Sequence, residues 1–238
     1  MCKLILMLFT HDPELARAAE DSGIDRIVVD FEFRGKKERQ SEYHLEVNKA
    51  TFKDLSKIRQ AVTIPVVARI NPISDSSRNE IETIINEGAD ILMLPMFRTR
   101  KEIEIFIGCT NKRAKTNLLF ETKDSVALAP EMEDLPFDEY YIGLNDMAIE
   151  HDLLFAYDVL KLGVIAHIRS ALSRQPFGFG GITIIGKGTP LATTAILQQM
   201  AYYGCSLAIL RRAFKRDIAG KSMRAEVERI KDFYESLR

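Results

Sequence analysis

Two acidic residues stand at the points where short apolar runs end. Glu121 directly follows the run LLF, and Asp146 ends the segment YYIGLND. Apolar runs without a helical period are typical of buried parallel strands, whose carboxyl ends share one face of a sheet or barrel. Two carboxylates at that face could bind one hard cation, Mg²⁺ or Mn²⁺. Alternatively, Thr122 and Asp124 could cap the helix after Glu121, and Asn145 with Asp146 could cap the next helix. A two-carboxylate metal site is therefore the central hypothesis.

Further polar residues occupy the ends of two other apolar runs. Asp30 and Glu32 in VVDFEF are two positions apart, so in a strand they would point the same way, although one of them could simply orient an arginine or a helix N-terminus. Arg69 and Asn71 end the segment ARIN. A guanidinium there could bind the carboxylate or enolate of a substrate, or it could close the barrel mouth through a salt bridge. We expect catalytic roles for Asp30, Glu32 and Arg69 and substrate binding by Asn71.

Glycines surround the run FGFGGITIIGKGTP at residues 177–190. The backbone amides at Gly180 and Gly181, with a helix beginning after Pro190, could form a cradle for an anion. Tight turns would explain the glycines about as well. Arg211 or Arg212, which follow the eighth expected strand, could reach such an anion.

A polar loop after the second expected strand carries several side chains that could close over an acidic substrate group. They are Lys36, Arg39, Gln40 and His44. Charge runs are more often solvated surface, so the alternative is a loop without a role in binding. Asn145, the neighbour of Asp146, is also assigned to substrate binding.

The apolar runs recur at an interval that suits a repeated strand and helix. Eight expected strands begin near residues 4, 26, 65, 89, 116, 139, 177 and 206, which leaves about 30 residues for each unit. This predicts an α/β fold, a (β/α)8 TIM barrel in a single domain over residues 1–238. A doubly wound open sheet is the alternative, but no GxGxxG turn follows the first run. We expect one helix over 156–173, a seventh strand over 177–182 and a closing helix over 222–238.

The charge balance argues against nucleic acid or anionic lipid as a partner. The 238 residues include 33 basic and 34 acidic side chains, for a formal charge of −1. Three cysteines without ligand spacing predict free thiols in a reducing compartment. The apolar run at the N-terminus is only about six residues long, too short to span a membrane. These features predict a cytoplasmic protein that does not bind membranes.

The strand-end motifs resemble those of one enzyme family. GIDRIVVDFE, VVARIN, EGADILMLPM, LLFET and YIGLNDMA, in this order over residues 20–150, are similar to motifs of the HpcH/HpaI aldolase and citrate lyase β-subunit family in the pyruvate/phosphoenolpyruvate barrel superfamily. The GKKERQ segment and the C-terminal part resemble a branch associated with bacterial surface-polysaccharide gene clusters.

This resemblance implies a metal-dependent lyase or aldolase. It implies that Glu121 and Asp146 bind Mg²⁺ or Mn²⁺, that Arg69 steadies a pyruvate enolate, and that Asp30 and Glu32 lie near water on the metal. The substrate would be a small keto acid or a phosphoenolpyruvate-like molecule. Family members commonly form homo-oligomers through an exchanged C-terminal helix; the helix expected over residues 222–238 is compatible with this and equally with an ordinary eighth barrel helix.

The chain departs from the family pattern at three positions. Phe33 stands where the aldolases have a histidine, Leu119 where they have a glutamine, and Met96 where citrate lyase relatives have a lysine. The general acid or base is therefore not identified, with a metal-bound water, His44 and His11 as candidates. Two other functions stay open: a phosphoenolpyruvate-using synthase or phosphotransfer enzyme in sugar modification, and a ligand-binding barrel without catalysis.

Overall fold

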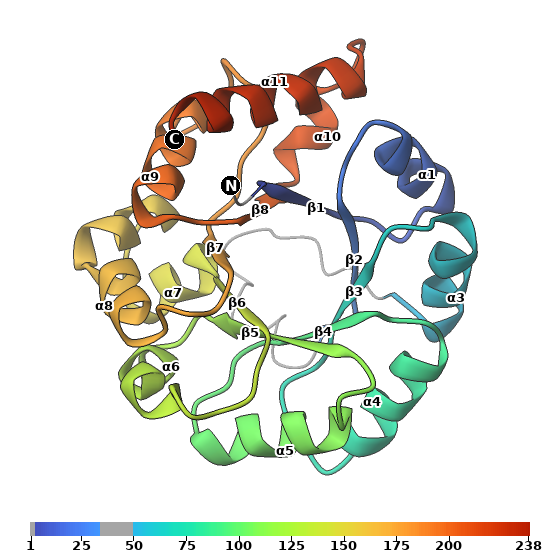
Figure 1. The fold of residues 1–238 in the computed structure, drawn as a ribbon, viewed down its shortest axis with the longest axis vertical. Coiled ribbons are helices and arrows are strands. Elements are labelled where there is room, and N and C mark those ends of the chain that lie inside the picture. The colour runs from blue at the N-terminus through green and yellow to red at the C-terminus, as the bar shows by residue number, and fades with distance from the viewer. Residues whose placement is uncertain (1–2, 34–49) are drawn as a thin grey trace.

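Eight parallel strands close into a barrel with helices around its outside (Figure 1). The computed structural model describes residues 3–33 and 50–238. Each strand pairs with the strand that follows it, and β8 pairs with β1 to close the ring. The predicted (β/α)8 TIM barrel is confirmed. The strands are β1 (Ile5–Phe9), β2 (Arg26–Asp30), β3 (Val66–Arg69), β4 (Ile91–Leu94), β5 (Lys115–Phe120), β6 (Glu139–Ile142), β7 (Phe177–Phe179) and β8 (Leu207–Leu210).

Helices connect the strands, and several begin at a capping threonine. The side chains of Thr51, Thr99 and Thr122 each accept from the backbone N–H three residues on, which satisfies a donor that the helix leaves open. The cap at Thr122 fixes the chain directly after Glu121. The helices are α1 (Pro13–Asp21), α3 (Phe52–Ala61), α4 (Ser77–Asn86), α5 (Arg100–Thr110), α6 (Lys123–Leu128), α7 (Leu144–Glu150), α8 (Val164–Ala171), α9 (Thr193–Tyr203), α10 (Ala213–Asp217) and α11 (Met223–Ser236), with the 3₁₀ helices η2 (Ala129–Met132) and η3 (Ala156–Leu162).

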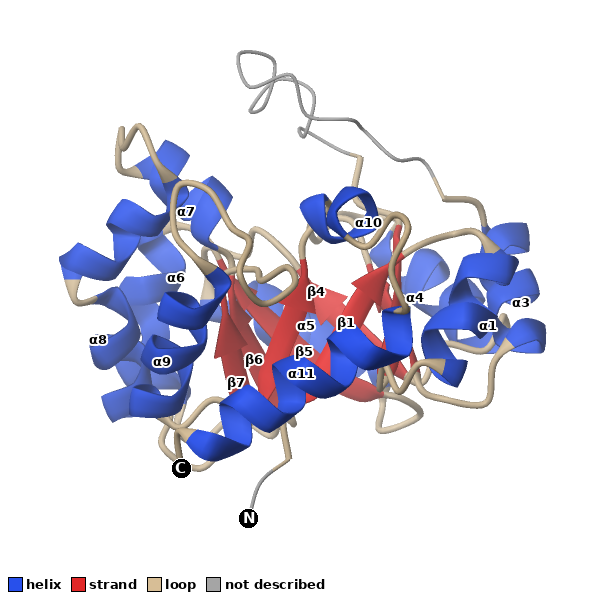
Figure 2. Ribbon diagram, turned by 90° about the horizontal axis from the view of Figure 1, so that it is seen from above, coloured by secondary structure: helices blue, strands red, loops and turns tan. Residues whose placement is uncertain are grey.

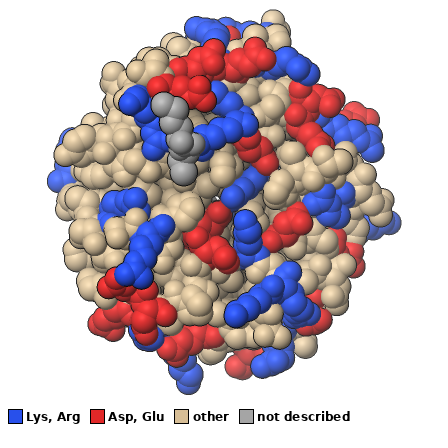
Figure 3. Space-filling view, viewed as in Figure 1, with Lys and Arg blue, Asp and Glu red and all other residues tan. Residues whose placement is uncertain are grey.

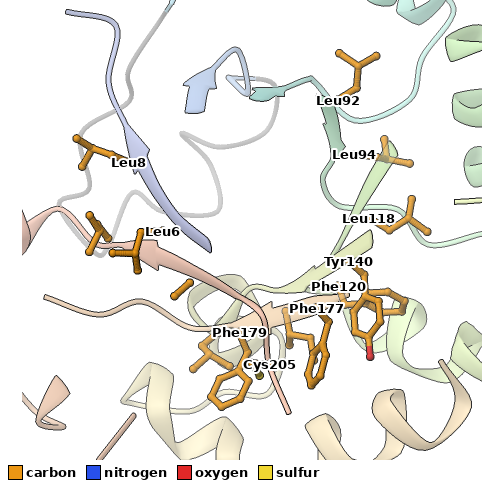
Figure 4. Close-up of a cluster of buried hydrophobic side chains, with 14 of the residues drawn as sticks. Leu6, Leu8, Leu92, Leu94, Leu118, Phe120, Tyr140, Phe177, Phe179 and Cys205 are labelled. Carbon is orange, nitrogen blue, oxygen red and sulfur yellow. The ribbon is translucent and has the colours of Figure 1, made fainter. Parts of the chain in front are cut away.

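Side chains along each strand alternate between the barrel interior and the surrounding helices. Leu92, Leu118 and Phe120 belong to the large outer core, and Figure 4 shows them on β4 and β5. The residues at the alternate positions of the strands belong to a separate interior cluster, which fills the barrel. That cluster comprises Met7, Val28, Val67, Ile91, Met93, Leu119, Tyr141 and Leu207. The period of two therefore decides which strand-end side chains reach the barrel mouth.

Two predicted elements are shorter than expected. The single helix over 156–173 is wrong: Gly163, with φ of +72°, separates η3 from α8 because it takes the left-handed conformation that glycine tolerates. Strand seven ends at Phe179 rather than at 182. Its pairing with β8 is correspondingly short, with one register pair, Gly178 with Leu207, and a separate bridge further on.

The hydroxyl of Tyr141 occupies this seam between β7 and β8. It donates to the carbonyl oxygen of Gly180 at 2.9 Å and accepts from the backbone N–H of Ile209 at 2.8 Å. Gly178 makes room for the ring, since a Cβ at that position would lie 2.8 Å from a ring carbon of Tyr141 and 1.9 Å from the carbonyl oxygen of Leu207. A side chain from β6 thus replaces part of the backbone ladder.

Helix α11 lies against the outside of its own barrel near β8 and β1 (Figures 1 and 2). Its buried face includes Val227, Ile230 and Tyr234, and the Tyr234 hydroxyl donates to the carbonyl oxygen of Cys205 at 2.5 Å. It therefore serves as an eighth barrel helix in this chain, and exchange between subunits stays a prediction. No helix among the described residues is long and apolar enough to cross a membrane.

The two ends of the barrel differ in the polar side chains that they present. Figure 2 shows the strands pointing to one side of the molecule, where α7 and α10 also lie. Figure 3 looks onto the opposite face, where the strands begin, and acidic and basic side chains are interspersed there. The strand ends, by contrast, gather the polar residues that the sequence marks as candidates.

Candidate functional site

The strand-end candidates reach the barrel mouth because they continue the interior side of their strands. Asp30 lies two residues beyond the interior Val28, and Arg69 lies two beyond Val67. The same step leads from Leu119 to Glu121, from Tyr141 to Gly143 and from Met7 to Phe9. Five strands, β1, β2, β3, β5 and β6, therefore contribute to one rim at the carboxyl ends, the face on which barrel enzymes build their sites.

Arg69 is held by both acids of the second strand end. Its Nε and Nη2 donate to the two oxygens of Asp30 at 2.9 and 2.7 Å, and its Nη1 lies 3.3 Å from Oε2 of Glu32. The guanidinium also lies over the ring of Phe9, 5.2 Å from its centroid. Asp30 and Glu32 thus do converge as their spacing predicts, and the salt bridge foreseen as the alternative for Arg69 is present.

The charges around Arg69 keep it protonated. Burial alone would lower the pKa of this guanidinium, but the charges of Asp30 and Glu32 outweigh that effect and raise it. The charge of Glu121 also raises it, by less than those of Asp30 and Glu32. Arg69 therefore presents a fixed positive charge between acids from two different strand ends.

Glu121 is buried and its carboxylate is positioned by two neighbouring strand ends. Its side chain is 2% exposed, and Oε1 accepts from the backbone N–H of Met96 at 3.1 Å. Oε2 occupies the space over Gly143, where a Cβ would lie only 2.9 Å from it. At the end of β4, Met96 adopts φ of +54° and donates its backbone N–H to this carboxylate.

Asp146 lies in a different local setting from the one expected. The strand β6 ends at Ile142, and Asp146 is a buried residue in the first turn of α7 rather than the last residue of a strand. A carboxylate in the first helical turn is favoured by the helix dipole. Gly143, which makes room for Glu121, precedes this helix and its backbone N–H donates to the carbonyl oxygen of Phe120. Glu121 thus directly follows β5, and Asp146 lies in the helix that follows β6.

The donor chemistry of Glu121 and Asp146 fits Mg²⁺ or Mn²⁺, because both offer buried carboxylate oxygens. The described residues contain no group of three or more histidine, cysteine, aspartate or glutamate side chains that could hold a metal ion. A cation at this place would therefore take its remaining ligands from substrate and water, as Mg²⁺ commonly does.

Asn71 connects the mouth to the barrel wall. Its Oδ1 accepts from the backbone N–H of Phe33 at 3.1 Å, and its Nδ2 donates to Oε1 of Glu80 at 2.8 Å. The side chain is 3% exposed. These contacts give Asn71 a positioning role between the second and third strand ends, and its contact with substrate stays a prediction.

The remaining candidates are distributed around the same rim or lie beyond what is described. Gly180 and Gly181 are half-buried beside the short strand β7, and Asn145 is exposed on α7. The loop candidates Lys36, Arg39, Gln40 and His44 lie outside the described residues.

A small cavity lined by Phe9, Thr10, His11, Val28 and Asp30 opens beside the rim. It brings His11 next to one of the acids that hold Arg69. The sequence names His11 only as a candidate acid or base, because nothing in the pattern after β1 shows that it shares a cavity with the end of β2.

Comparison with known proteins adds no assignment. No model of a known protein family matches the chain, and no curated protein matches it. The case for a function therefore depends on the site geometry and on the motif resemblance.

Proposed function

We propose that this protein is a metal-dependent carbon–carbon lyase or aldolase that acts through an enolate derived from pyruvate or phosphoenolpyruvate. The observation that supports the proposal most strongly is that a guanidinium fixed by Asp30, that of Arg69, and the buried carboxylate of Glu121 both continue the interior side of their strands at one rim. Mg²⁺ or Mn²⁺ held by Glu121 and Asp146 would supply Lewis-acid polarisation of a keto acid.

Arg69 stabilises the negative charge that develops when a bond next to the keto group breaks. Two N–H groups of its fork are taken by Asp30, so the guanidinium is oriented before substrate arrives. Such preorganised donors are worth about 2.7–4 kcal/mol of transition-state stabilisation when one is removed. Glu32, which is 1% exposed, prevents the guanidinium from turning away.

The proton that the reaction transfers is moved by a group other than the side chain of Phe33, the residue after Glu32. Phe33 cannot accept a proton, and its ring is 45% exposed at the mouth. His11 is our candidate among the described residues, since it lines the same cavity as Asp30. A keto-acid substrate seated between Arg69 and Glu121 would then have an acid/base group on the β1 side.

The test is the cleavage of oxaloacetate and of a 4-hydroxy-2-keto acid with and without Mg²⁺ or Mn²⁺. We expect the metal to accelerate release of pyruvate, Glu121→Gln to abolish that response, and Arg69→Lys to lower kcat by about 10²–10³-fold because Lys lacks the fork. His11→Gln should lower kcat and alter its pH profile.

The matched control is Glu228→Gln, which removes one acid from the exposed face of α11 that pairs with no described residue. It should behave as the wild type does. Undiminished turnover in the presence of a chelator would sink the metal-dependent scheme. Release of phosphate from phosphoenolpyruvate without aldol cleavage would instead favour a phosphoenolpyruvate-using synthase, and ligand binding without any turnover would favour a binding barrel.

A further inference from the structure

Arg211 directly follows β8 on the interior side of that strand. It lies two residues beyond Ile209, which packs against the interior cluster, and four beyond Leu207, which belongs to it. Its backbone N–H donates to the carbonyl oxygen of Ile182 at 2.9 Å. Arg211 therefore belongs to the same rim as Arg69, with the ends of β1 and β2 between them.

Within residues 3–33 and 50–238, the guanidinium of Arg211 has only neutral partners. Its Nη1 donates to the hydroxyl of Tyr157 at 3.3 Å and to the carbonyl oxygen of Thr189 at 3.2 Å. Its Nε is buried and has no hydrogen-bond partner, and no carboxylate of the described residues pairs with it. Arg69 and Arg26, the other arginines on the interior side of strands, each share two hydrogen bonds with one carboxylate.

Tyr157 and the glycine turn fix this arginine in place. The Tyr157 hydroxyl donates to the carbonyl oxygen of Gly181 at 2.7 Å, which leaves its oxygen to accept from Arg211. A Cβ on Gly181 would lie 3.1 Å from Cβ of Arg211, and Gly180 has φ of +65° with a Cβ position 3.0 Å from Leu144. Glycine is therefore favoured at Gly180 by the positive φ and at Gly181 by the close approach of Arg211.

We propose that Arg211, fixed by Tyr157 over the Gly180–Gly181 turn, is a second anion-binding site at the barrel mouth. Its ligand is a carboxylate or phosphate group, which the Nε and Nη2 edge of a guanidinium can bind with two parallel hydrogen bonds. An anion there would satisfy a buried donor that otherwise has no partner. Asp217, the acid that follows on α10, does not compete, because it is paired with Arg216 and Thr183.

The second anion site indicates the substrate class of the proposed function, and this part of the inference rests on that function. Arg69 would stabilise the keto-acid end, and Arg211 would bind an anionic group at the other end of the same molecule. The expected substrate is thus a keto acid with a second carboxylate, or an aldol product that carries a phosphate. Anion binding itself does not depend on the reaction.

The experiment is calorimetric titration of the full chain at low ionic strength with inorganic phosphate and, separately, with succinate. We expect Arg211→Gln to weaken binding of the preferred probe about tenfold or more and Tyr157→Phe to weaken it several-fold. Arg211→Lys keeps the charge without the fork and should fall in between. The control Arg224→Gln removes an equal charge from α11, where its Nη2 donates to the carbonyl oxygen of Asp21, and should bind as the wild type does.

Oxalate, an enolate mimic, is titrated with Mg²⁺ in the same variants to separate the two proposals. Arg211→Gln should leave oxalate affinity unchanged. The second site would be overturned if phosphate and succinate bind Arg211→Gln with the same affinity as the wild type. It would also be overturned if they bind to neither protein. If oxalate does not bind but phosphate or succinate binding still depends on Arg211, the anion site stands and the enolate function fails. Circular dichroism confirms that each variant is folded.

Discussion

The backbone N–H of Met96 donates to Oε1 of Glu121 from a left-handed conformation, with φ of +54°. A non-glycine residue pays about 1–2 kcal/mol for that conformation. Such strain persists where surrounding contacts over-determine it, and it concentrates at functional sites. The strained backbone of Met96, at the end of β4, thus orients the carboxylate of Glu121 in the proposed metal site.

Gly143→Ala should displace that carboxylate without straining the backbone. Gly143 has φ of −83° and ψ of 108°, which alanine adopts readily, but the new Cβ would lie 2.9 Å from Oε2 and 3.2 Å from Cβ of Glu121. We expect the affinity for Mg²⁺ or Mn²⁺ to fall about tenfold or more, with a loss of stability of about 1–3 kcal/mol from overpacking. Metal titrations and urea denaturation would measure both effects.

Gly108→Ala is the matched control for this variant. Gly108 lies within α5, and nothing stands within 4 Å of the position that its Cβ would take. Alanine should raise the free energy of unfolding by about 0.5–1 kcal/mol because it suits a helix interior better than glycine. Equal metal affinities in Gly143→Ala and Gly108→Ala would remove Glu121 from the proposed site.

Tyr141→Phe should weaken the seam between β7 and β8. The variant keeps the ring but removes the oxygen that accepts from the Ile209 N–H and donates to the Gly180 carbonyl. A buried donor left without a partner costs about 1–3 kcal/mol. We expect a loss of stability in that range by urea denaturation, with faster amide hydrogen exchange at Ile209. Unchanged exchange there would show that the ladder does not depend on the hydroxyl.

The sequence predicted the barrel because its signals are local and periodic. Each apolar run marks one strand, and the interval between runs leaves room for one crossover helix. The spacing of Asp30 and Glu32 likewise predicted that both side chains would point the same way, and in the structure both contact Arg69. These features need no knowledge of which strands meet across the barrel.

The features that escaped prediction depend on contacts between distant segments. Nothing near Met96 indicates that its amide meets a carboxylate from β5, and nothing near Tyr157 indicates that it holds an arginine after β8. The break at Gly163 was missed because apolar residues continue with helical spacing on both sides of it. Backbone donors and φ values follow from the packed structure and leave little trace in residue type.

Stability in acid should depend on Glu150. A hydrogen bond from Arg98 lowers the pKa of this carboxyl below its usual 4.5, against the opposing effect of burial. The folded state therefore binds the proton less readily than the unfolded state. The resulting stabilisation is fully present above about pH 4.5 and is lost as the pH falls through the lower folded value. Glu150→Gln should flatten the decline in unfolding free energy below pH 4.5.

Urea denaturation between about pH 3 and pH 7 would measure this dependence. Glu228→Gln again serves as control, since it removes an exposed acid that pairs with no described residue. A parallel acid decline in wild type and Glu150→Gln would mean that the pairing with Arg98 does not persist in solution.

The opposite end of the barrel holds a buried ion pair whose role should be structural. Arg26 at the start of β2 donates to both oxygens of Glu139 at the start of β6, at 2.6 and 3.0 Å, and Asn117 donates to the same carboxylate at 2.8 Å. The two charged side chains are only 9% and 5% exposed. Glu139→Leu leaves a guanidinium buried without its counter-charge, so we expect a loss of about 3–5 kcal/mol in unfolding free energy.

The double variant Arg26→Leu with Glu139→Leu should regain much of that loss, because an apolar pair in place of a buried ion pair is often close to neutral. A double-mutant cycle by urea denaturation measures the coupling between the two side chains. The variants that fold should keep full affinity for oxalate with Mg²⁺. The pair lies at the end of the barrel where the strands begin, and residues at that end of a barrel serve stability rather than catalysis. Loss of oxalate affinity in the folded double variant would show instead that the two ends of the barrel are coupled.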